Sequence, residues 1–494
     1  MIRRSMRFFL GLACSSAIFA IGCGDTIDNP PPPPGPPVSD VTGTIIDVHV
    51  TENGDMPNMR EPSQYEVAAV FPGDDGTPRE IPALINKDGS FVISNVPEVP
   101  YDLRFVELYG AGTLPPRYIV NAPRNIDLGR VYAGRPDAEL IETEPTEIAL
   151  SATNLEPWSD GDALELFSLG SGSAGALLPT NGTFPTTGTT SLNDYRVDTS
   201  RLLNATLVSG DKGDKAVITQ LAGTAHLTAP YQSVRKVLEP PTFTQTDGEL
   251  TSVSGTFTDV PQKDLPIDIT ASAFNAFASD VHSTATVVGK NVRLIAEPGG
   301  ERATVSITPN LVLCEALPSA TLPQSFSYGN PFPSAWAEVV SADVAFAMTH
   351  VLPSGISKST AVTIGQSAPA SSFVTPAVPL IGPPLDIKVN DMPAQDTLTG
   401  IGFTPTVTFS PPSLGTPAVY IIAIRRLDPG GATTRTIAVF STTDTTLRIP
   451  DGLLSFGYYY YFRVSVRASF DTTTPFKSGT TNAYASALTG VLTP

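Results

Sequence analysis

The stretch Leu454–Val466, LSFGYYYYFRVSV in one-letter code, decides the fold of the C-terminal part of the chain. It opens with a glycine-containing turn and continues as a run in which Phe462, Val464 and Val466 alternate with Arg463 and Ser465. Side chains that alternate in polarity at a period of two belong to a half-buried β-strand. The stretch therefore predicts a strand with one face in a core and one face turned outward.

The same stretch carries a spacing that resembles the tyrosine corner of fibronectin type III domains. Leu454 is followed three residues later by Gly457, and Tyr460 comes three residues after that. In that family the tyrosine lies at the start of strand F and bonds back to the backbone. The resemblance implies that residues 381–494 form a β-sandwich in which Tyr460 points inward. Tyr459 and Tyr461 then lie on the opposite face as cross-strand partners, and no binding site is assigned to them.

Upstream segments fit the other strands expected of such a sandwich. They are Pro405–Pro412, Val419–Arg426 and Thr446–Pro450. Phe456 stands where the family has a proline, and the tryptophan usual on the second strand is absent. Phe409 is the nearest replacement for that tryptophan.

A second resemblance lies near the N-terminus, in residues 41–142. The segments that carry it are Val41-x-Gly43, Gly89-x-Phe91-x-Ile93, Asn95-Val96-Pro97 and Tyr101-x-Leu103. They resemble carboxypeptidase regulatory-like domains, which are transthyretin-like or Cna-B-like sandwiches. Val99-Pro100 departs from the glycine that the family has before the tyrosine. The resemblance implies a β-sandwich that serves as a spacer or an adhesive module without catalysis.

The middle of the chain, residues 143–380, resembles no family but is rich in strand patterns. We expect strands at Ile148–Leu155, Ala163–Leu169, Lys215–Leu221, Ser252–Val260, Ser283–Ile295, Ala303–Leu313 and Ala337–Thr349. Long loops such as Ser171–Ser191 divide them, and Ala271–His282 is either a short helix or a strand. One large sandwich or barrel and two smaller sandwiches both remain open. The predicted fold class is all-β, with tandem β-sandwich domains behind a lipidated N-terminal tether.

The first forty residues predict export and anchoring. Arg3, Arg4 and Arg7 precede a short apolar core, which is the pattern of a signal peptide over residues 1–22. Gly22-Cys23 resembles the end of a bacterial lipobox, which implies that Cys23 is the lipid attachment site. Residues 23–40 then contain a polyproline run, which is a stiff and extended spacer. The resemblance implies anchoring at the outer membrane, because Gly24 replaces the retention aspartate of enteric lipoproteins.

Composition limits the partners. The chain of 494 residues has a formal net charge of −18, which becomes −21 when a signal peptide with three arginines is removed. Such an acidic balance argues against nucleic acid as a partner. Once Cys14 leaves with the signal peptide and Cys23 carries lipid, Cys314 remains alone in an apolar run, where we expect a small buried residue.

One group of residues is a weak candidate for a metal-binding or sugar-binding site. Trp158, Asp160, Asp162 and Glu165 gather around a turn, where the acids suit Ca²⁺ and the indole suits a sugar ring. Asp-Gly is above all a turn former, so the structural interpretation is preferred. Asp211–Asp214 is likewise interpreted as a hairpin turn, and the four histidines, His49, His226, His282 and His350, show no metal-binding spacing. No catalytic, cofactor-binding or metal residue is assigned, and no cofactor is expected.

These observations favour a non-catalytic exported lipoprotein that acts as a surface or periplasmic scaffold, adhesion or ligand-binding protein. Its expected partners are the membrane, through the lipid anchor, and a glycan or protein ligand. One alternative is an anchored polysaccharide hydrolase with paired carboxylates in the middle region, which a sequence scan cannot detect. A second alternative is a subunit of an envelope assembly.

Overall fold

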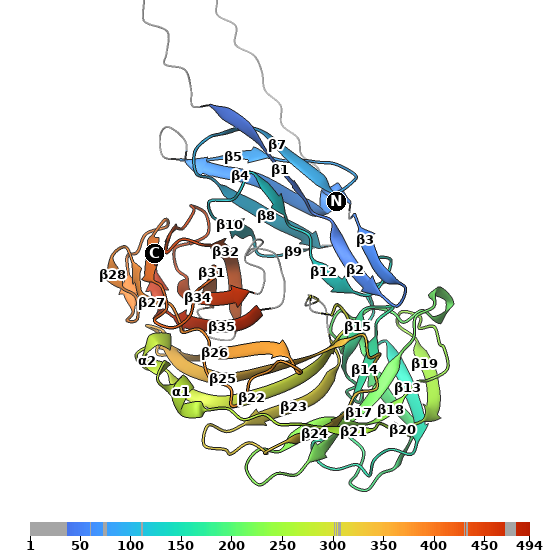
Figure 1. Ribbon diagram of the computed structural model, residues 1–494. Coiled ribbons are helices and arrows are strands. Elements are labelled where there is room, and N and C mark those ends of the chain that lie inside the picture. Colours follow the sequence, from blue (N-terminus) through green and yellow to red (C-terminus); the bar gives the residue numbers. More distant parts are fainter. Residues whose placement is uncertain are drawn as a thin grey trace, which may run out of the picture. The chain divides into compact units, whose positions relative to one another are not determined.

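The computed structural model describes residues 37–494 except 60, 73–76, 110–111, 301, 303, 305–307, 429, 431–432 and 470–480. The predicted signal peptide, Cys23, nearly all of the tether and the turn at 73–76 therefore lie outside the described residues. Val38–Pro494 forms one compact unit. Among the described residues it is built almost wholly of strands (Figure 1), which confirms the all-β fold class. No helix in this part of the chain has the length and apolar character needed to cross a bilayer.

The N-terminal part folds as two facing sheets. One contains β11 (Asn125–Asp127), β1 (Val38–Thr44), β7 (Ser90–Pro97) and β6 (Leu84–Ile85). Opposite lie β5 (Pro78–Pro82), β4 (Tyr65–Pro72), β8 (Asp102–Tyr109), β9 (Gly112–Thr113) and β10 (Arg117–Ile119). Val41, Phe91, Ile93 and Leu103 are all fully buried between them, so the predicted alternation selects the core face. Gly89 has φ 77°, as a tight Asp-Gly turn requires. The family suggested by these residues stays a prediction.

A small third sheet continues from this sandwich. It contains β12 (Val131–Ala133), β2 (Asp47–Thr51) and β3 (Gly54–Asn58). The β2–β3 hairpin is tied to later parts of the chain by ion pairs of Asp55 with Arg302 and of Glu52 with Lys215.

The first half of the middle region has its own apolar core. On one side are β13 (Glu147–Thr153), β16 (Ser191–Asp198) and β19 (Leu250–Thr256), and on the other β14 (Ala163–Ser168), β15 (Ser173–Ala176), β17 (Val217–Thr224) and β18 (Tyr231–Leu238). Ile148, Leu150, Leu166 and Ile218 are fully buried in this core. The expected loop Ser171–Ser191 is wrong in part, because β15 lies within it and pairs with β14.

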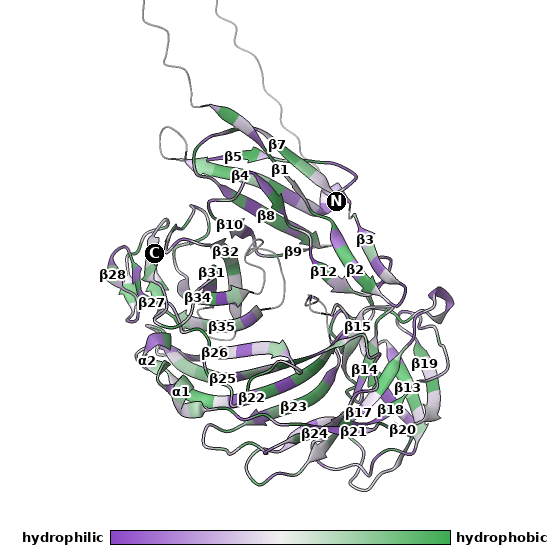
Figure 2. Ribbon diagram, viewed as in Figure 1, coloured by the Kyte–Doolittle hydropathy of each residue, from purple (hydrophilic) through white to green (hydrophobic). Residues whose placement is uncertain are grey.

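The second half of the middle region is dominated by long antiparallel strands. They are β22 (Thr286–Glu297), β23 (Asn310–Ala316), β25 (Ala337–Val351) and β26 (Ser357–Pro369), accompanied by the short β20 (Thr258–Asp259), β21 (Gln262–Leu265) and β24 (Phe326–Gly329). Buried and less buried residues alternate along most of β22 and β25, and Figure 2 shows both hydrophobic and hydrophilic residues on these strands. The segment Ala271–His282 is helical, as α1 (Ala271–Asn275) and α2 (Ala278–Val281).

The C-terminal part is a β-sandwich made of two sheets. One sheet contains β28 (Met392–Pro393), β27 (Leu385–Val389), β30 (Thr406–Ser410) and β33 (Thr446–Arg448). The other contains β32 (Thr434–Thr442), β31 (Val419–Leu427), β34 (Tyr459–Ser469) and β35 (Thr481–Leu488), with the short β29 (Leu398–Thr399) and β36 (Leu492–Thr493) at its end. The Tyr460 side chain is buried, and its hydroxyl accepts a hydrogen bond from the Ser455 backbone N–H at 2.9 Å. Phe409 is buried against Tyr420, with ring centroids 4.9 Å apart.

Strand pairing crosses both boundaries suggested by the sequence. β10 pairs in parallel with β32, and β26 pairs with β35 through Gly365–Tyr484 and Gln366–Ala483. These pairings join strands of the N-terminal, middle and C-terminal parts in one hydrogen-bonded sheet. The division into domains at residues 142 and 380 stays a prediction.

Candidate functional site

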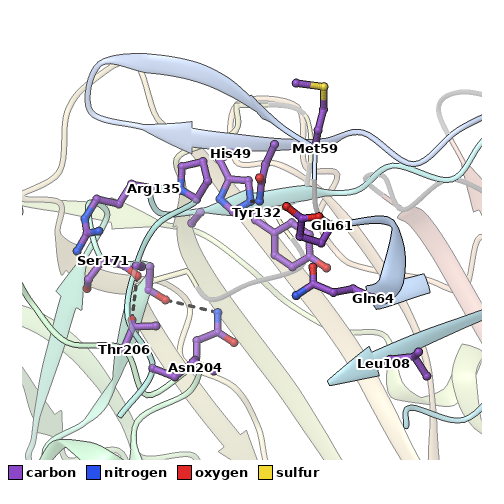
Figure 3. Close-up of a pocket in the computed structure, with 16 residues that line it drawn as sticks. His49, Met59, Glu61, Gln64, Leu108, Tyr132, Arg135, Ser171, Asn204 and Thr206 are labelled. Atoms are coloured by element: carbon purple, nitrogen blue, oxygen red, sulfur yellow. Dashed lines mark hydrogen bonds between the residues drawn. The ribbon is translucent and has the colours of Figure 1, made fainter. Parts of the chain in front are cut away.

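A cavity of about 560 Å³ lies where the β2–β3 hairpin and the end of β12 meet the loops around Ser171 and Asn204 (Figure 3). Its wall includes the aromatic ring of Tyr132 and the polar side chains of Asn58, Gln64 and Asn204. Pockets that bind small molecules combine an apolar or aromatic surface with a few converging polar groups. This cavity has both.

His49 forms a fixed part of the wall. Its Nδ1 lies 2.7 Å from the carbonyl oxygen of Gly134, which only accepts, so Nδ1 carries the proton. Its Nε2 faces the Asn58 side-chain amide at 3.2 Å and accepts from it. The ring also stacks on Tyr132, with centroids 5.4 Å apart. These contacts hold the imidazole in one orientation beside Asn58 and Tyr132.

Two glycines allow the cavity floor to form. Gly134 and Gly172 have φ values of 102° and 73°. A Cβ on Gly134 would lie 2.6 Å from the Cα of Gly172, and a Cβ on Gly172 would lie 2.5 Å from the carbonyl oxygen of Ala133. Only residues without a side chain permit this approach of two backbones in this conformation. The Arg135 N–H donates to the Gly170 carbonyl at 2.8 Å and joins the two segments.

The side chain of Arg135, next to the cavity floor, is held by an ion pair with Asp214. Its Nε and one terminal nitrogen donate to the two oxygens of Asp214 at 2.9 and 3.1 Å. The Asp214 side chain is 1% exposed and also accepts from the Ser209 N–H at 2.9 Å. The hairpin turn expected at Asp211–Asp214 is wrong, because the segment forms a 3-10 turn (Gly210–Lys212) and the flanking strands β16 and β17 pair with other strands. Its last residue, Asp214, is buried beside the cavity.

The rim supplies groups for ligand contact. The Thr206 hydroxyl donates to the Ser171 carbonyl at 2.8 Å, and the Asn204 amide donates to the Gly172 carbonyl at 3.4 Å. The Ser171 hydroxyl is buried without a hydrogen-bond partner among the described residues. Asn204 and Gln64 are exposed side chains in the cavity lining (Figure 3), so amide groups are available to a ligand there.

A second cavity, of about 680 Å³, contains part of the acidic cluster singled out in the sequence. Asp160 lines it together with Glu315 and Tyr231. Both carboxylates are exposed. Trp158, in contrast, is 4% exposed and belongs to the core of the middle region, so its suggested role in stacking on a sugar ring is wrong.

The other two acids of that cluster are buried and hydrogen-bonded. Asp162 accepts from the Ser159 hydroxyl at 2.8 Å and from the Gly223 N–H at 2.7 Å. Glu165 accepts from the Asn310 side chain at 2.7 Å, and burial raises the pKa of its carboxyl group. Asp162 and Glu165 therefore serve the fold. No group of three or more His, Cys, Asp or Glu side chains within the described part of the chain is arranged to hold a metal ion.

The remaining residues named from the sequence lie apart from both cavities. Cys314 is 1% exposed, and burial raises the pKa of its thiol to about 11. Tyr461, expected on the outer face of its sheet, is buried because the ring of His350 stacks on it at 4.4 Å. The outer face of β34 is thus covered at this point by β25.

Sequence reasoning did not find the His49 cavity. Its residues come from separate segments, and only the fold brings them together. The available signals were the two glycines and Asn204, which has φ 60° in a conformation that favours Asn among residues with side chains.

Comparisons with known proteins add little. No family model and no curated protein matches the chain. Among solved structures, the chain is similar to the crystal structure of chicken CNTN1 FN1-FN3 domains, with 11% identity over 72% of this chain and 98% of that one. The TM-score is 0.14, so this similarity carries no argument about function.

Proposed function

We propose that this chain is a non-catalytic, exported lipoprotein whose β-sandwiches present a ligand-binding site at the His49 cavity. A role as scaffold or ligand-binding protein is supported by the resemblance of the C-terminal sequence to fibronectin type III domains. Fold alone does not assign a function, so the proposal rests on the cavity. The observation that carries it is the convergence of Tyr132, Asn58, Gln64 and Asn204 on one space.

The chemistry of the cavity fits a neutral saccharide. A sugar offers one apolar face for an aromatic ring and hydroxyl groups for amide side chains, and the cavity provides both kinds of partner. Arg135 is ion-paired with Asp214, so it offers no uncompensated charge to a ligand. Glu61, an exposed carboxylate of the lining, would accept hydrogen bonds from sugar hydroxyl groups. A glycan is thus the favoured ligand class.

The proposed anchor rests on the sequence. Gly22-Cys23 and the following polyproline run support lipid attachment at Cys23 and a spacer up to the first strand. We propose that this places the sandwiches outside the cell or in the periplasm, anchored to the outer membrane. Mass spectrometry of the N-terminal peptide tests this: a lipid-modified Cys23 supports anchoring, and an unmodified terminus contradicts it.

The binding proposal is tested by glycan-array screening of the full chain, followed by titration of the best neutral oligosaccharide. Gln64→Ala removes an exposed rim amide whose side chain makes no hydrogen bond with another described residue, and we expect it to weaken binding at least fivefold. Asn181→Ala, at an exposed asparagine remote from the cavity lining, is the matched control. No binding on the array, or equal binding by both variants, would contradict the proposal.

The hydrolase alternative has one supporting observation, the presence of Asp160 and Glu315 on one cavity. Glycosidases use two carboxylates that flank the scissile bond. The same oligosaccharides, incubated with the protein and analysed for shorter products, separate the two functions. Products that disappear in Glu315→Gln would establish the hydrolase and overturn the non-catalytic assignment.

A further inference from the structure

Arginines gather on the outer face of the C-terminal sheet, and none of Arg117, Arg425, Arg463 and Arg467 lines either cavity. One row of paired residues crosses four neighbouring strands. It begins at Arg463 on β34, which pairs with Ala423 on β31. Ala423 pairs with Val439 on β32, and Val439 pairs with Arg117 on β10. These four positions form one cross-strand row in which all side chains share a face. Arg117 and Arg463 end up about 14 Å apart at their Cα atoms, three strand spacings.

Two further arginines belong to the same face. Arg467 is four residues after Arg463 on β34, about 13 Å further along, and an even spacing keeps it on the same side. Arg425 lies opposite Tyr461 and is a diagonal neighbour of Arg463. Ala423, between the long side chains, is small, so the arginine side chains extend over a shallow apolar floor.

These guanidinium groups lack acidic partners. Arg117, Arg463 and Arg467 make no side-chain hydrogen bond or ion pair with another residue that the structure describes, and the Arg463 Nε is buried and unsatisfied. Glu107, the one acid that acts on Arg117, is already ion-paired with Arg130. Burial lowers the pKa of Arg117 to about 10, with Arg130 as the next cause, and it lowers the pKa of Arg463 and Arg467, where neighbouring arginines add to the effect.

The contrast with other arginines of this acidic protein is clear. Ion pairs with carboxylates hold Arg104, Arg130, Arg135, Arg196, Arg201 and Arg302. The chain has a net charge of −18, yet among the residues that the structure describes no carboxylate is paired with Arg117, Arg463 or Arg467, and Glu107, which acts on Arg117, is ion-paired with Arg130. Keeping several partly desolvated cations together without a counter-charge costs stability.

We propose that Arg117, Arg463 and Arg467, supported by Arg425, form a binding site for a ligand that carries several carboxylate or phosphate groups. A guanidinium presents a planar fork of donors that matches such oxyanions in a bidentate manner. The separation of the arginines selects a ligand with more than one anionic group, since one small anion does not reach all three. This site is built from other residues than the His49 cavity and adds a second, charged ligand class to the proposed function.

Calorimetric titration of the full chain in detergent tests the site. The probes are inorganic triphosphate and an oligogalacturonate, which separate a phosphate source from a carboxylate-bearing sugar source, with a neutral oligosaccharide as reference. We expect at least one probe to bind, with affinity falling as salt rises. Arg463→Gln and Arg467→Gln should each weaken binding at least tenfold, whereas Arg448→Gln, at an exposed arginine of the opposite sheet, should change it less than twofold.

Urea unfolding of each variant shows whether a loss of binding comes from a misfolded variant or from the missing guanidinium group. Because its charge is uncompensated in the free protein, Arg463→Gln should leave the urea midpoint unchanged or raise it, and Arg463→Lys should keep partial binding. The proposal is overturned if neither probe binds at low salt, if Arg448→Gln weakens binding as much as Arg463→Gln, or if Arg463→Gln lowers the urea midpoint. Gln64→Ala should leave anion binding unaffected, so failure at one site does not decide the other.

Discussion

The contact between His350 and Tyr461 predicts a specific loss of stability in mild acid. His350 lies on β25 with 1% of its surface exposed, and neither ring nitrogen has a hydrogen-bond partner among the described residues. Burial, with a smaller contribution from His282, lowers the pKa of its imidazole from 6.5 to about 4. The folded protein therefore holds a neutral ring that an unfolded chain would protonate at pH 5.

The sign and size follow from proton linkage. Between pH 6.5 and 4 the unfolded state binds more protons than the folded state, so stability rises with pH in this window. The contribution is fully present above pH 6.5 and is lost as the pH falls towards 4. From these two pKa values, the contribution of His350 to the free energy of unfolding decreases by about 2 kcal/mol between pH 7.5 and pH 5. Asp102 and Glu297, whose pKa values are raised to about 6 and about 7, contribute with the opposite sign in the wild type and in a His350 variant alike.

His350→Phe isolates this effect. Phenylalanine keeps a ring stacked on Tyr461 and removes two buried polar nitrogens, so we expect the variant to be more stable by about 1 kcal/mol at pH 7.5. Its advantage should widen to about 3 kcal/mol at pH 5, where the wild-type imidazole opposes folding. Urea unfolding at the two pH values, followed by the fluorescence of Trp158 and Trp336, measures the difference.

The control is His226→Gln, a half-buried histidine outside this contact, which should keep the wild-type pH dependence. Parallel pH curves for the wild type and His350→Phe would refute the reasoning, because they would mean that the buried ring is not held neutral. A steeper curve for His350→Phe would refute it as well.

Two further substitutions test the anchors of the fold. Tyr460→Phe removes the acceptor of the Ser455 N–H and should lower the free energy of unfolding by about 1 kcal/mol, whereas Tyr458→Phe, at a half-buried position, should change it less. Asp214→Ala leaves Arg135 and the Ser209 N–H without their buried partner and should cost about 3–5 kcal/mol. Urea midpoints check both, and Asp211→Ala, at an exposed neighbour, should remain within about 0.5 kcal/mol of wild type.

The sequence by itself determined the local structure well. Alternation at a period of two identified the strands that bury Phe91 and Ile93 and those that bury Phe462 and Val464. The spacing of Leu454, Gly457 and Tyr460 predicted an inward tyrosine bonded to the preceding turn. These features are local, because the pattern of a strand states which face is buried and a turn needs only its own few residues.

The sequence was weaker where strands are long and mixed in composition. The long strand β26 was not recognised, and β15 was assigned to a loop. The indole of Trp158 was considered for ligand contact, although it fills a core. The pattern of one strand does not show which other elements pack against it. Trp158 and Tyr461 are buried because residues from other segments pack on them.

Only the tertiary structure decided where the candidate sites lie. The His49 cavity needs β12 to approach the loop around Gly172, and the arginine row needs β10 to pair with β32. Both depend on contacts between residues far apart in sequence, whose register is set by the packing of whole sheets. Sequence patterns fix which side chains face outward, whereas long-range strand pairing determines which of those side chains become neighbours.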